Sequence, residues 1–118
     1  MAVKDILGRR GEELAAGFLA ERGYRILDRN WRCRDGEIDV VAELSGEVVF
    51  VEVKTRSSVA YGHPFEAITP VKLARLRRLA AAWCAQAEAR PARIRLDAIA
   101  ILDEAGAEPS IEHLAGIE

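Results

Sequence analysis

The fold of this chain is decided by residues 36–56, which read GEIDVVAELSGEVVFVEVKTR. Two runs rich in Val, Ile and Phe flank the turn dipeptide Ser45-Gly46, and this pattern is typical of a β-hairpin with a two-residue loop. Side chains alternate between the two faces of a strand, so the position of the loop decides which residues share a face. The stretch therefore predicts both a hairpin and its register.

Counting outward from a Ser45-Gly46 loop gives the cross-strand pairs of the hairpin. One face would be apolar and would carry Leu44–Glu47, Ala42–Val49, Val40–Val51 and Ile38–Val53. The other face would be mixed and would carry Val41–Phe50, Asp39–Glu52 and Glu37–Lys54. This register predicts that the carboxylates of Asp39 and Glu52 lie directly opposite each other.

The opposed carboxylates of Asp39 and Glu52 suggest a metal site. Like charges on facing strands destabilise a sheet, because their Cβ atoms are only about 4.5–5.5 Å apart. A hard divalent cation such as Mg²⁺ suits one or two carboxylates together with water, and Lys54 could hold a water or a phosphate oxygen beside it. The alternative is a solvated polar face on which Lys54 bridges Glu37 and Glu52, and a bulge would separate the two acids.

The spacing of Asp39 and Glu52-Val53-Lys54 resembles the Asp…(Asp/Glu)-x-Lys site of the restriction-endonuclease-like nucleases, with Ile38 in place of their frequent proline. Further matches stand in order along the chain, and they are Gly8, Gly11-Glu12, Gly23-Tyr24, Asn30, Gly36–Asp39, Phe50–Arg56, Gly62, Lys72 and Asp97. Over about residues 3–115, these motifs resemble the YraN-like family of small bacterial proteins. That family is itself similar to the archaeal Holliday-junction resolvases.

The resemblance implies a restriction-endonuclease-like core, in which a mixed β-sheet is flanked by an N-terminal helix and a second helix. It implies Mg²⁺ or Mn²⁺ as the cofactor and DNA as the nucleic-acid partner. The implied metal ligands are Asp39, Glu52, Glu12 and the main-chain carbonyl of Val53. The implied catalytic residues are Asp39, Glu52, Lys54 and Glu12.

Length and composition predict a single globular domain over residues 1–118. No apolar run approaches the 18 residues of a membrane-spanning helix, so no membrane partner is expected. The charged N-terminus does not look like a signal peptide, so we expect a cytoplasmic protein in which Cys33 and Cys84 are reduced thiols. The net charge is −2, yet residues 1–102 carry 17 basic and 14 acidic side chains, which leaves room for nucleic-acid contacts.

Residues 4–22 are predicted to form a helix that ends at Gly23. Its apolar stripe is expected to consist of Leu7, Gly11, Leu14 and Phe18. Glu12 falls at the border of this stripe, where a glutamate is usually a solvated flank residue. If the helix packs on the mixed face of the hairpin, Glu12 would point at Asp39 and Glu52. The resemblance to the junction resolvases gives Glu12 the role of a third acidic ligand.

Residues 24–27 are predicted to form a strand, followed by a polar connection over 28–35 that contains Trp31. A tryptophan flanked by arginines can stack on a base, but more often it plugs the end of a core. The polar stretch after Lys54 must border the candidate site. Arg56 and Ser57 are therefore candidate phosphate contacts.

Thr69 and Pro70 are predicted to open a second helix as its N-cap and first residue. Its core stripe is expected to be Leu73, Leu76, Ala80, Trp83 and Ala87. A basic face lies off this stripe; it is either simply solvated or contacts a nucleic-acid backbone through Lys72, Arg75 and Arg78. Strands at residues 94–102 and 111–114 complete an α/β fold in the order α-β-β-β-α-β-β, with Asp97 taken as structural.

Together these features predict a metal-dependent endonuclease-like protein that hydrolyses phosphodiester bonds in DNA, with branched or structured DNA as candidate substrates. Two alternatives stay open. The chain could be a nucleic-acid-binding module with little or no catalysis of its own, or a protein-interaction domain that pairs through exposed strand edges. A homodimer is a candidate assembly.

Overall fold

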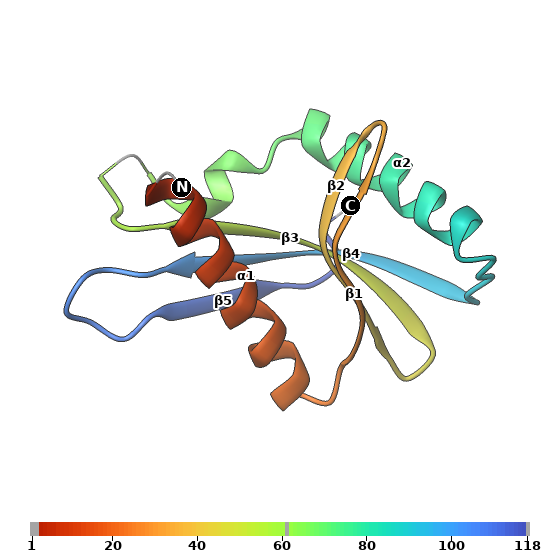
Figure 1. The fold of residues 1–118 in the computed structure, drawn as a ribbon, viewed down its shortest axis with the longest axis horizontal. Helices are drawn as coiled ribbons and strands as arrows, with labels where there is room; N and C mark the ends of the chain where they lie inside the picture. The colour runs from red at the N-terminus through yellow and green to blue at the C-terminus, as the bar shows by residue number, and fades with distance from the viewer. Residues whose placement is uncertain (1–2, 61, 118) are drawn as a thin grey trace.

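A five-stranded mixed sheet with one helix packed on each face forms the body of the protein (Figure 1). The computed structural model describes residues 3–60 and 62–117. Its elements are α1 (Val3–Glu21), β1 (Arg25–Cys33), β2 (Gly36–Leu44), β3 (Glu47–Arg56), the short 3-10 helix η1 (Pro64–Ala67), α2 (Pro70–Gln86), β4 (Arg93–Leu102) and β5 (Ser110–Leu114). The predicted α/β class and element order are confirmed.

The strands lie side by side in their order along the chain, from β1 at one edge to β5 at the other. Strands β3 and β4 are parallel, and every other neighbouring pair is antiparallel, so the sheet is mixed as predicted. The parallel pair needs a crossover connection, which α2 provides. This crossover brings α2 to the face of the sheet opposite α1.

The β2–β3 hairpin has the predicted loop and register at its closed end. Ser45 and Gly46 have φ angles of 51° and 81°, the positive values that a type I′ turn requires. The paired residues run in the expected register from Leu44–Glu47 to Val40–Val51. This agreement arises because the turn and the alternation of side chains are both local properties of residues 40–51.

The register prediction is wrong beyond this point, where Ile38 and Val53 do not form a pair on one apolar face. Val53 lies in the core cluster beneath α1, whereas Ile38 lies in the cluster beneath α2. The reason is that a side-chain oxygen replaces a main-chain carbonyl as the acceptor: the Val53 N–H donates to Oδ2 of Asp39 at 2.7 Å. A regular ladder would give that N–H to the main chain of Ile38. The hairpin therefore opens at Asp39.

Helix α1 packs on the apolar face of the hairpin, not on the mixed face. The core beneath it consists of Ala15, Leu19, Val40, Ala42, Val49, Val51, Val53, Ile99 and Ile101. The helix approaches β3 so closely that a Cβ added at Gly11 would lie 1.8 Å from Oγ1 of Thr55. A glycine is needed here because this close contact leaves no room for a side chain.

Helix α2 covers the mixed face. Thr69 is its N-cap, with Oγ1 accepting the Lys72 N–H at 3.2 Å, and Pro70 is its first residue, as predicted. The core beneath α2 consists of Ile38, Val41, Val48, Phe50, Leu76, Leu79, Ala80, Trp83 and Leu96. Trp31 packs against this core and donates its Nε1–H to Gln86, as the core-plug interpretation expects.

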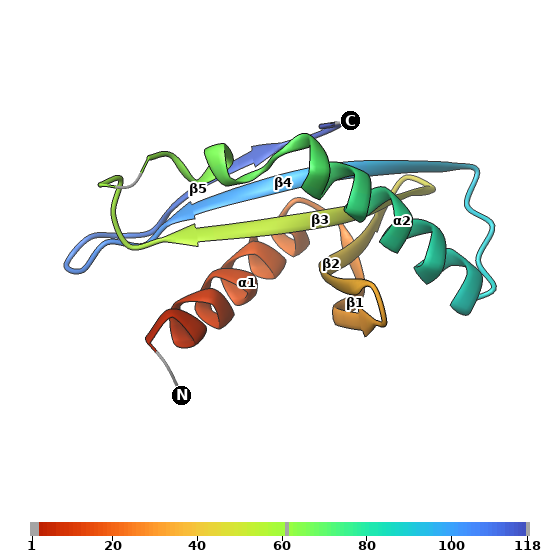
Figure 2. The ribbon, with the colours of Figure 1, turned by 90° about the horizontal axis from the view of Figure 1, so that it is seen from above.

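Strand β1 is longer than predicted, because residues 28–33 continue the strand instead of forming a polar connection. Its pairing with β2 shifts between Ile26 and Asp28, which marks a bulge. A polar sequence is tolerated because β1 is an edge strand with one side open to water. The β1–β2 hairpin stands between α1 and α2 in both views (Figures 1 and 2).

Candidate functional site

The candidate site lies where β2 separates from β3. Asp39 is the central residue, and its Oδ2 accepts the Val53 N–H at 2.7 Å. Because the main chain of β2 no longer pairs with β3 at this point, polar side chains can enter the sheet from both faces. Glu12 reaches the gap from α1, and Glu52 borders it on the α2 side.

Three carboxylates converge in this gap, namely those of Glu12, Glu37 and Asp39. One oxygen of each lies within 4.8 Å of the others. Asn30 ties the group together, since its Nδ2 donates to Oε1 of Glu12 at 2.6 Å and to Oε1 of Glu37 at 3.3 Å. The other oxygen of Glu37 accepts from Nε of Arg32 at 2.6 Å. The gap thus brings together acidic side chains from α1 and β2.

Burial and the charge of Glu52 raise the pKa of Asp39 from its ordinary value of 3.8 to about 8. The hydrogen bond from Val53 opposes this rise, and the charges of Glu12 and Glu37 add to it. Asp39 therefore holds its proton at neutral pH in the metal-free protein. A neighbouring cation would favour the ionised form instead.

Glu52 is near enough for its charge to raise the pKa of Asp39, but the regular pairing ends at Val40–Val51, so the two acids do not form the predicted cross-strand pair. Glu52 is also not one of the three carboxylates that converge within 4.8 Å. Burial raises the pKa of Glu52, and the charges of Arg75, Lys72 and Lys54 lower it in part. The α2 side of the gap is therefore bordered by positive side chains, while its α1 side is acidic.

Lys54 is half-buried on β3 and forms no ion pair with any described residue. The alternative in which Lys54 bridges Glu37 and Glu52 is not what the structure shows, because Glu37 pairs with Arg32. The ammonium group of Lys54 acts on Glu52 through its charge alone. It is therefore available to a negatively charged ligand.

The candidate nucleic-acid contacts lie at unequal distances from the gap. Lys72 and Arg75 are close enough to lower the pKa of Glu52, and Arg78 is exposed one turn further along α2. Ser57 is exposed just beyond β3. Arg56 is half-buried at the end of β3, where its Nε has no hydrogen-bond partner among the described residues.

Glu37 is the residue of the cluster to which sequence reasoning gave no ligand role. Its position two residues before Asp39 puts both side chains on one face of a regular strand, so the strand period could have found it. The hairpin register instead assigned Glu37 to Lys54. That assignment failed because the two strands part before reaching it.

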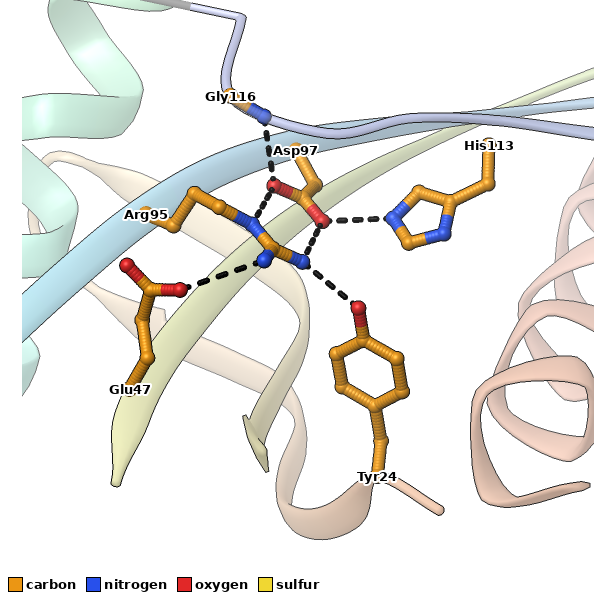
Figure 3. A network of polar contacts seen from close by, with 6 residues as sticks. All are labelled: Tyr24, Glu47, Arg95, Asp97, His113 and Gly116. Atoms are coloured by element: carbon orange, nitrogen blue, oxygen red, sulfur yellow. Dashed lines mark hydrogen bonds and ion pairs between the residues drawn. The ribbon is translucent and has the colours of Figure 1, made fainter. Parts of the chain in front are cut away.

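Asp97 lies outside this site in a separate buried network (Figure 3). Its carboxylate accepts from Nε and Nη2 of Arg95, both at 2.8 Å, from the Gly116 N–H at 3.0 Å, and contacts Nε2 of His113 at 2.6 Å. Burial alone would raise the pKa of Asp97, but these bonds hold it below its ordinary value. The network links β4 to the end of the chain, which agrees with a structural role.

These observations define an α/β protein whose mixed sheet opens around a carboxylate cluster with cationic side chains on one border. The sequence model of the Uncharacterised protein family UPF0102 matches residues 11–101. The chain therefore belongs to this family, and the predicted YraN-like resemblance is confirmed.

Relatives match along nearly the whole chain. A UPF0102 protein of Arthrobacter sp. (strain FB24) is 58% identical over 117 residues, which are 99% of each chain. A UPF0102 protein of Leifsonia xyli subsp. xyli is 56% identical over 99% of each chain. A third, from Paenarthrobacter aurescens, is 54% identical over 99% of this chain and 97% of its own. No helix in the described residues is long and apolar enough to cross a membrane.

Proposed function

We propose that the chain is a Mg²⁺- or Mn²⁺-dependent endonuclease-like protein that hydrolyses phosphodiester bonds in DNA. The observation that carries this proposal is the half-buried Asp39 at the strand break, with its Oδ2 on the Val53 N–H. Three further carboxylates surround it, and the ammonium group of Lys54 lies nearby without an ion-pair partner among the described residues. Folding alone gains nothing from such a concentration of like charges.

The donor set fits a hard divalent cation, because Glu12, Glu37 and Asp39 each offer a carboxylate oxygen to the gap. Asp39, Glu52 and Glu12 would hold the ion. The carbonyl of Val53 is a further candidate, since the N–H and C=O of one strand residue point to the same side and the Val53 N–H points at Asp39. Burial first, and then the charges of Glu52, Glu12 and Glu37, raise the pKa of Asp39 in the metal-free protein, and a bound cation would oppose this rise.

When bound, the ion would supply positive charge to the scissile phosphate and increase the acidity of the attacking water. Lys54 would donate to a phosphate oxygen or orient the water. The water oxygen forms a bond to phosphorus as one P–O ester bond breaks, and the departing oxygen receives a proton. Lys72, Arg75 and Arg78 would contact the DNA backbone, with Arg56 and Ser57 at the end of β3.

The decisive experiment incubates the protein with linear duplex, single-stranded, flap and four-way-junction DNA, each with Mg²⁺, Mn²⁺ or EDTA. Cleavage of at least one DNA with a metal, and of none with EDTA or with Asp39→Asn, would support the proposal. The Arg32–Glu37 ion pair favours a second candidate, a nucleic-acid-binding module, because it already neutralises one acid of the cluster. Salt-sensitive DNA binding without any cleavage would identify that module.

Asp39→Asn should be more stable than the parent protein in EDTA, and its advantage should grow between about pH 4 and pH 8. The folded parent keeps a proton on Asp39 up to about pH 8, whereas the unfolded chain releases it near 3.8. The parent therefore loses stability as the pH rises through this window, by up to about 1.4 kcal/mol per pH unit, and asparagine does not titrate. Urea denaturation at several pH values measures the difference.

The same variant should lose Mn²⁺ binding in a calorimetric titration, because its amide replaces the central carboxylate. The stability measurement serves as the control, since a folded Asp39→Asn protein cannot lose metal through unfolding. An unchanged Mn²⁺ affinity would remove Asp39 from the site.

The double variant Arg75→Ala and Arg78→Ala should weaken DNA binding about equally for all sequences. Each lost phosphate contact should reduce the log–log salt slope by about 0.9 on duplex DNA, hence by about 1.8 for both. Arg90→Ala with Arg93→Ala is the matched control, because it removes the same charge beyond the other end of α2. Equal slopes for the two double variants would place the DNA elsewhere on the protein.

A further inference from the structure

Asn30 has a backbone conformation that its place in the fold does not explain. Its φ is 51° in the middle of β1, a left-handed value that is uncommon in strands, although asparagine adopts it more readily than most other non-glycine residues. The other described non-glycine residues with positive φ are Ser45 and Glu88. Ser45 lies in the I′ turn and Glu88 follows the end of α2, where such values are expected. A strained residue inside a strand persists only if something else holds it.

The position of Asn30 is directly across from Asp39. The β1–β2 register pairs Arg29 with Val40 and Trp31 with Ile38, so Asn30 and Asp39 occupy the row between them. This is the row at which β2 leaves β3. The strain in β1 and the break in the sheet therefore occur at the same point.

The side chain of Asn30 joins α1 to β2 at the cluster. Its Nδ2 donates to Glu12 on α1 at 2.6 Å and to Glu37 on β2 at 3.3 Å. Both donors come from one uncharged amide. Arg32 pairs with Glu37, whereas Asn30 carries no charge, so its hydrogen bonds orient both carboxylates without adding an ion pair. The charge of Glu12 therefore stays available to a cation.

We infer that Asn30 is a positioning residue, whose left-handed backbone aims its amide so that Glu12 is held against Glu37 and Asp39. This inference rests on the proposed metal-dependent function. Groups that orient metal ligands in this way typically contribute 10- to 100-fold to metal affinity. Helix α1 packs on the apolar face of the β2–β3 hairpin, and Glu12 lies at the border of that contact. Without the hydrogen bond from Asn30, Glu12 would be a flexible side chain at the edge of the helix.

Asn30→Gly tests the inference, because glycine accepts the positive φ without strain and removes only the amide. Its unfolding free energy should be equal to or above that of the parent, while the Kd for Mn²⁺ in calorimetry should rise at least about tenfold. Ser45→Gly is the matched control, since Ser45 has the same positive φ of 51° in the turn of the β2–β3 hairpin, far from the cluster. This change removes the same backbone strain and should leave the Kd for Mn²⁺ unchanged.

A double-mutant cycle with Glu12→Gln separates positioning from a general structural effect. If Asn30 acts through Glu12, then Asn30→Gly in the Glu12→Gln background should raise the Kd by less than about threefold further. Full additivity, or an unchanged Kd in Asn30→Gly alone, would overturn the inference while leaving the proposed function standing. Failure of the parent itself to bind Mn²⁺ would overturn the proposed function, and the inference with it.

Discussion

Lys54→Ala should slow metal-dependent DNA cleavage at least about a hundredfold, while Mn²⁺ and DNA binding stay nearly intact. The reason is that the ammonium of Lys54, which no ion pair with a described residue holds, would act mainly on the charge that develops at the phosphate. Removing one preorganised donor of this kind costs about 2.7 kcal/mol of barrier or more. The measurement is a single-turnover assay on whichever DNA the substrate panel identifies.

Lys54→Arg should not restore the rate, because a planar guanidinium is a different donor from a compact ammonium. Asp39→Asn serves as the comparison, because it should lose both metal binding and cleavage. Lys54→Ala should instead lose cleavage and keep metal binding. Equal single-turnover rates for the parent, Lys54→Ala and Lys54→Arg would remove Lys54 from the chemistry.

Asp97→Asn should destabilise the protein by about 3–5 kcal/mol at neutral pH. Asp97 is fully buried, and it is the shared acceptor for Arg95, His113 and the Gly116 N–H. Asp97→Asn removes the central charge of this ionic network and leaves Arg95 with only the Glu47 carboxylate, at 3.3 Å, as an ion-pair partner among the described residues, which is the costly way to break such a network. Chemical denaturation of both proteins at pH 7 measures the loss.

The matched control is Glu43→Gln, which breaks the exposed ion pair between Arg25 and Glu43 and should cost less than about 1 kcal/mol. The pKa of Asp97 lies below 3.8 in the folded protein, so its contribution to stability is present above that value and is lost as the pH falls through the lower folded value. The cost of Asp97→Asn should therefore shrink below about pH 4. A cost at pH 7 no larger than that of Glu43→Gln would contradict the role of Asp97 as the common acceptor.

Most of the framework could be predicted from the sequence, because its signals are local. The Ser45-Gly46 turn determines the hairpin register as far as Val40–Val51, and Thr69-Pro70 marks the first turn of α2. The element order follows from similar short-range patterns. In each case the residues that carry the signal are close together in the chain, so no tertiary contact is needed to interpret them.

The composition of the candidate site depended on contacts between distant residues. The alternation of side chains along the strands predicted that Ile38 pairs with Val53. Instead, the carboxylate of Asp39 accepts the hydrogen bond from the Val53 N–H, and the regular pairing ends there. The polar sequence of residues 28–33 did not reveal that β1 continues to Cys33, because this part of the strand is stabilised by pairing with β2.

Sequence by itself thus determined which elements form and which acids stand in the Asp…Glu-x-Lys pattern. Tertiary structure decided that Glu37 joins Glu12 and Asp39, and that Lys54 has no ion-pair partner among the described residues. It also decided that α1 brings Glu12 to the cluster while packing on the apolar face of the β2–β3 hairpin. The physical reason is that burial and electrostatic coupling are set by how the layers pack around the strand break. Neither quantity has a local signature in the chain.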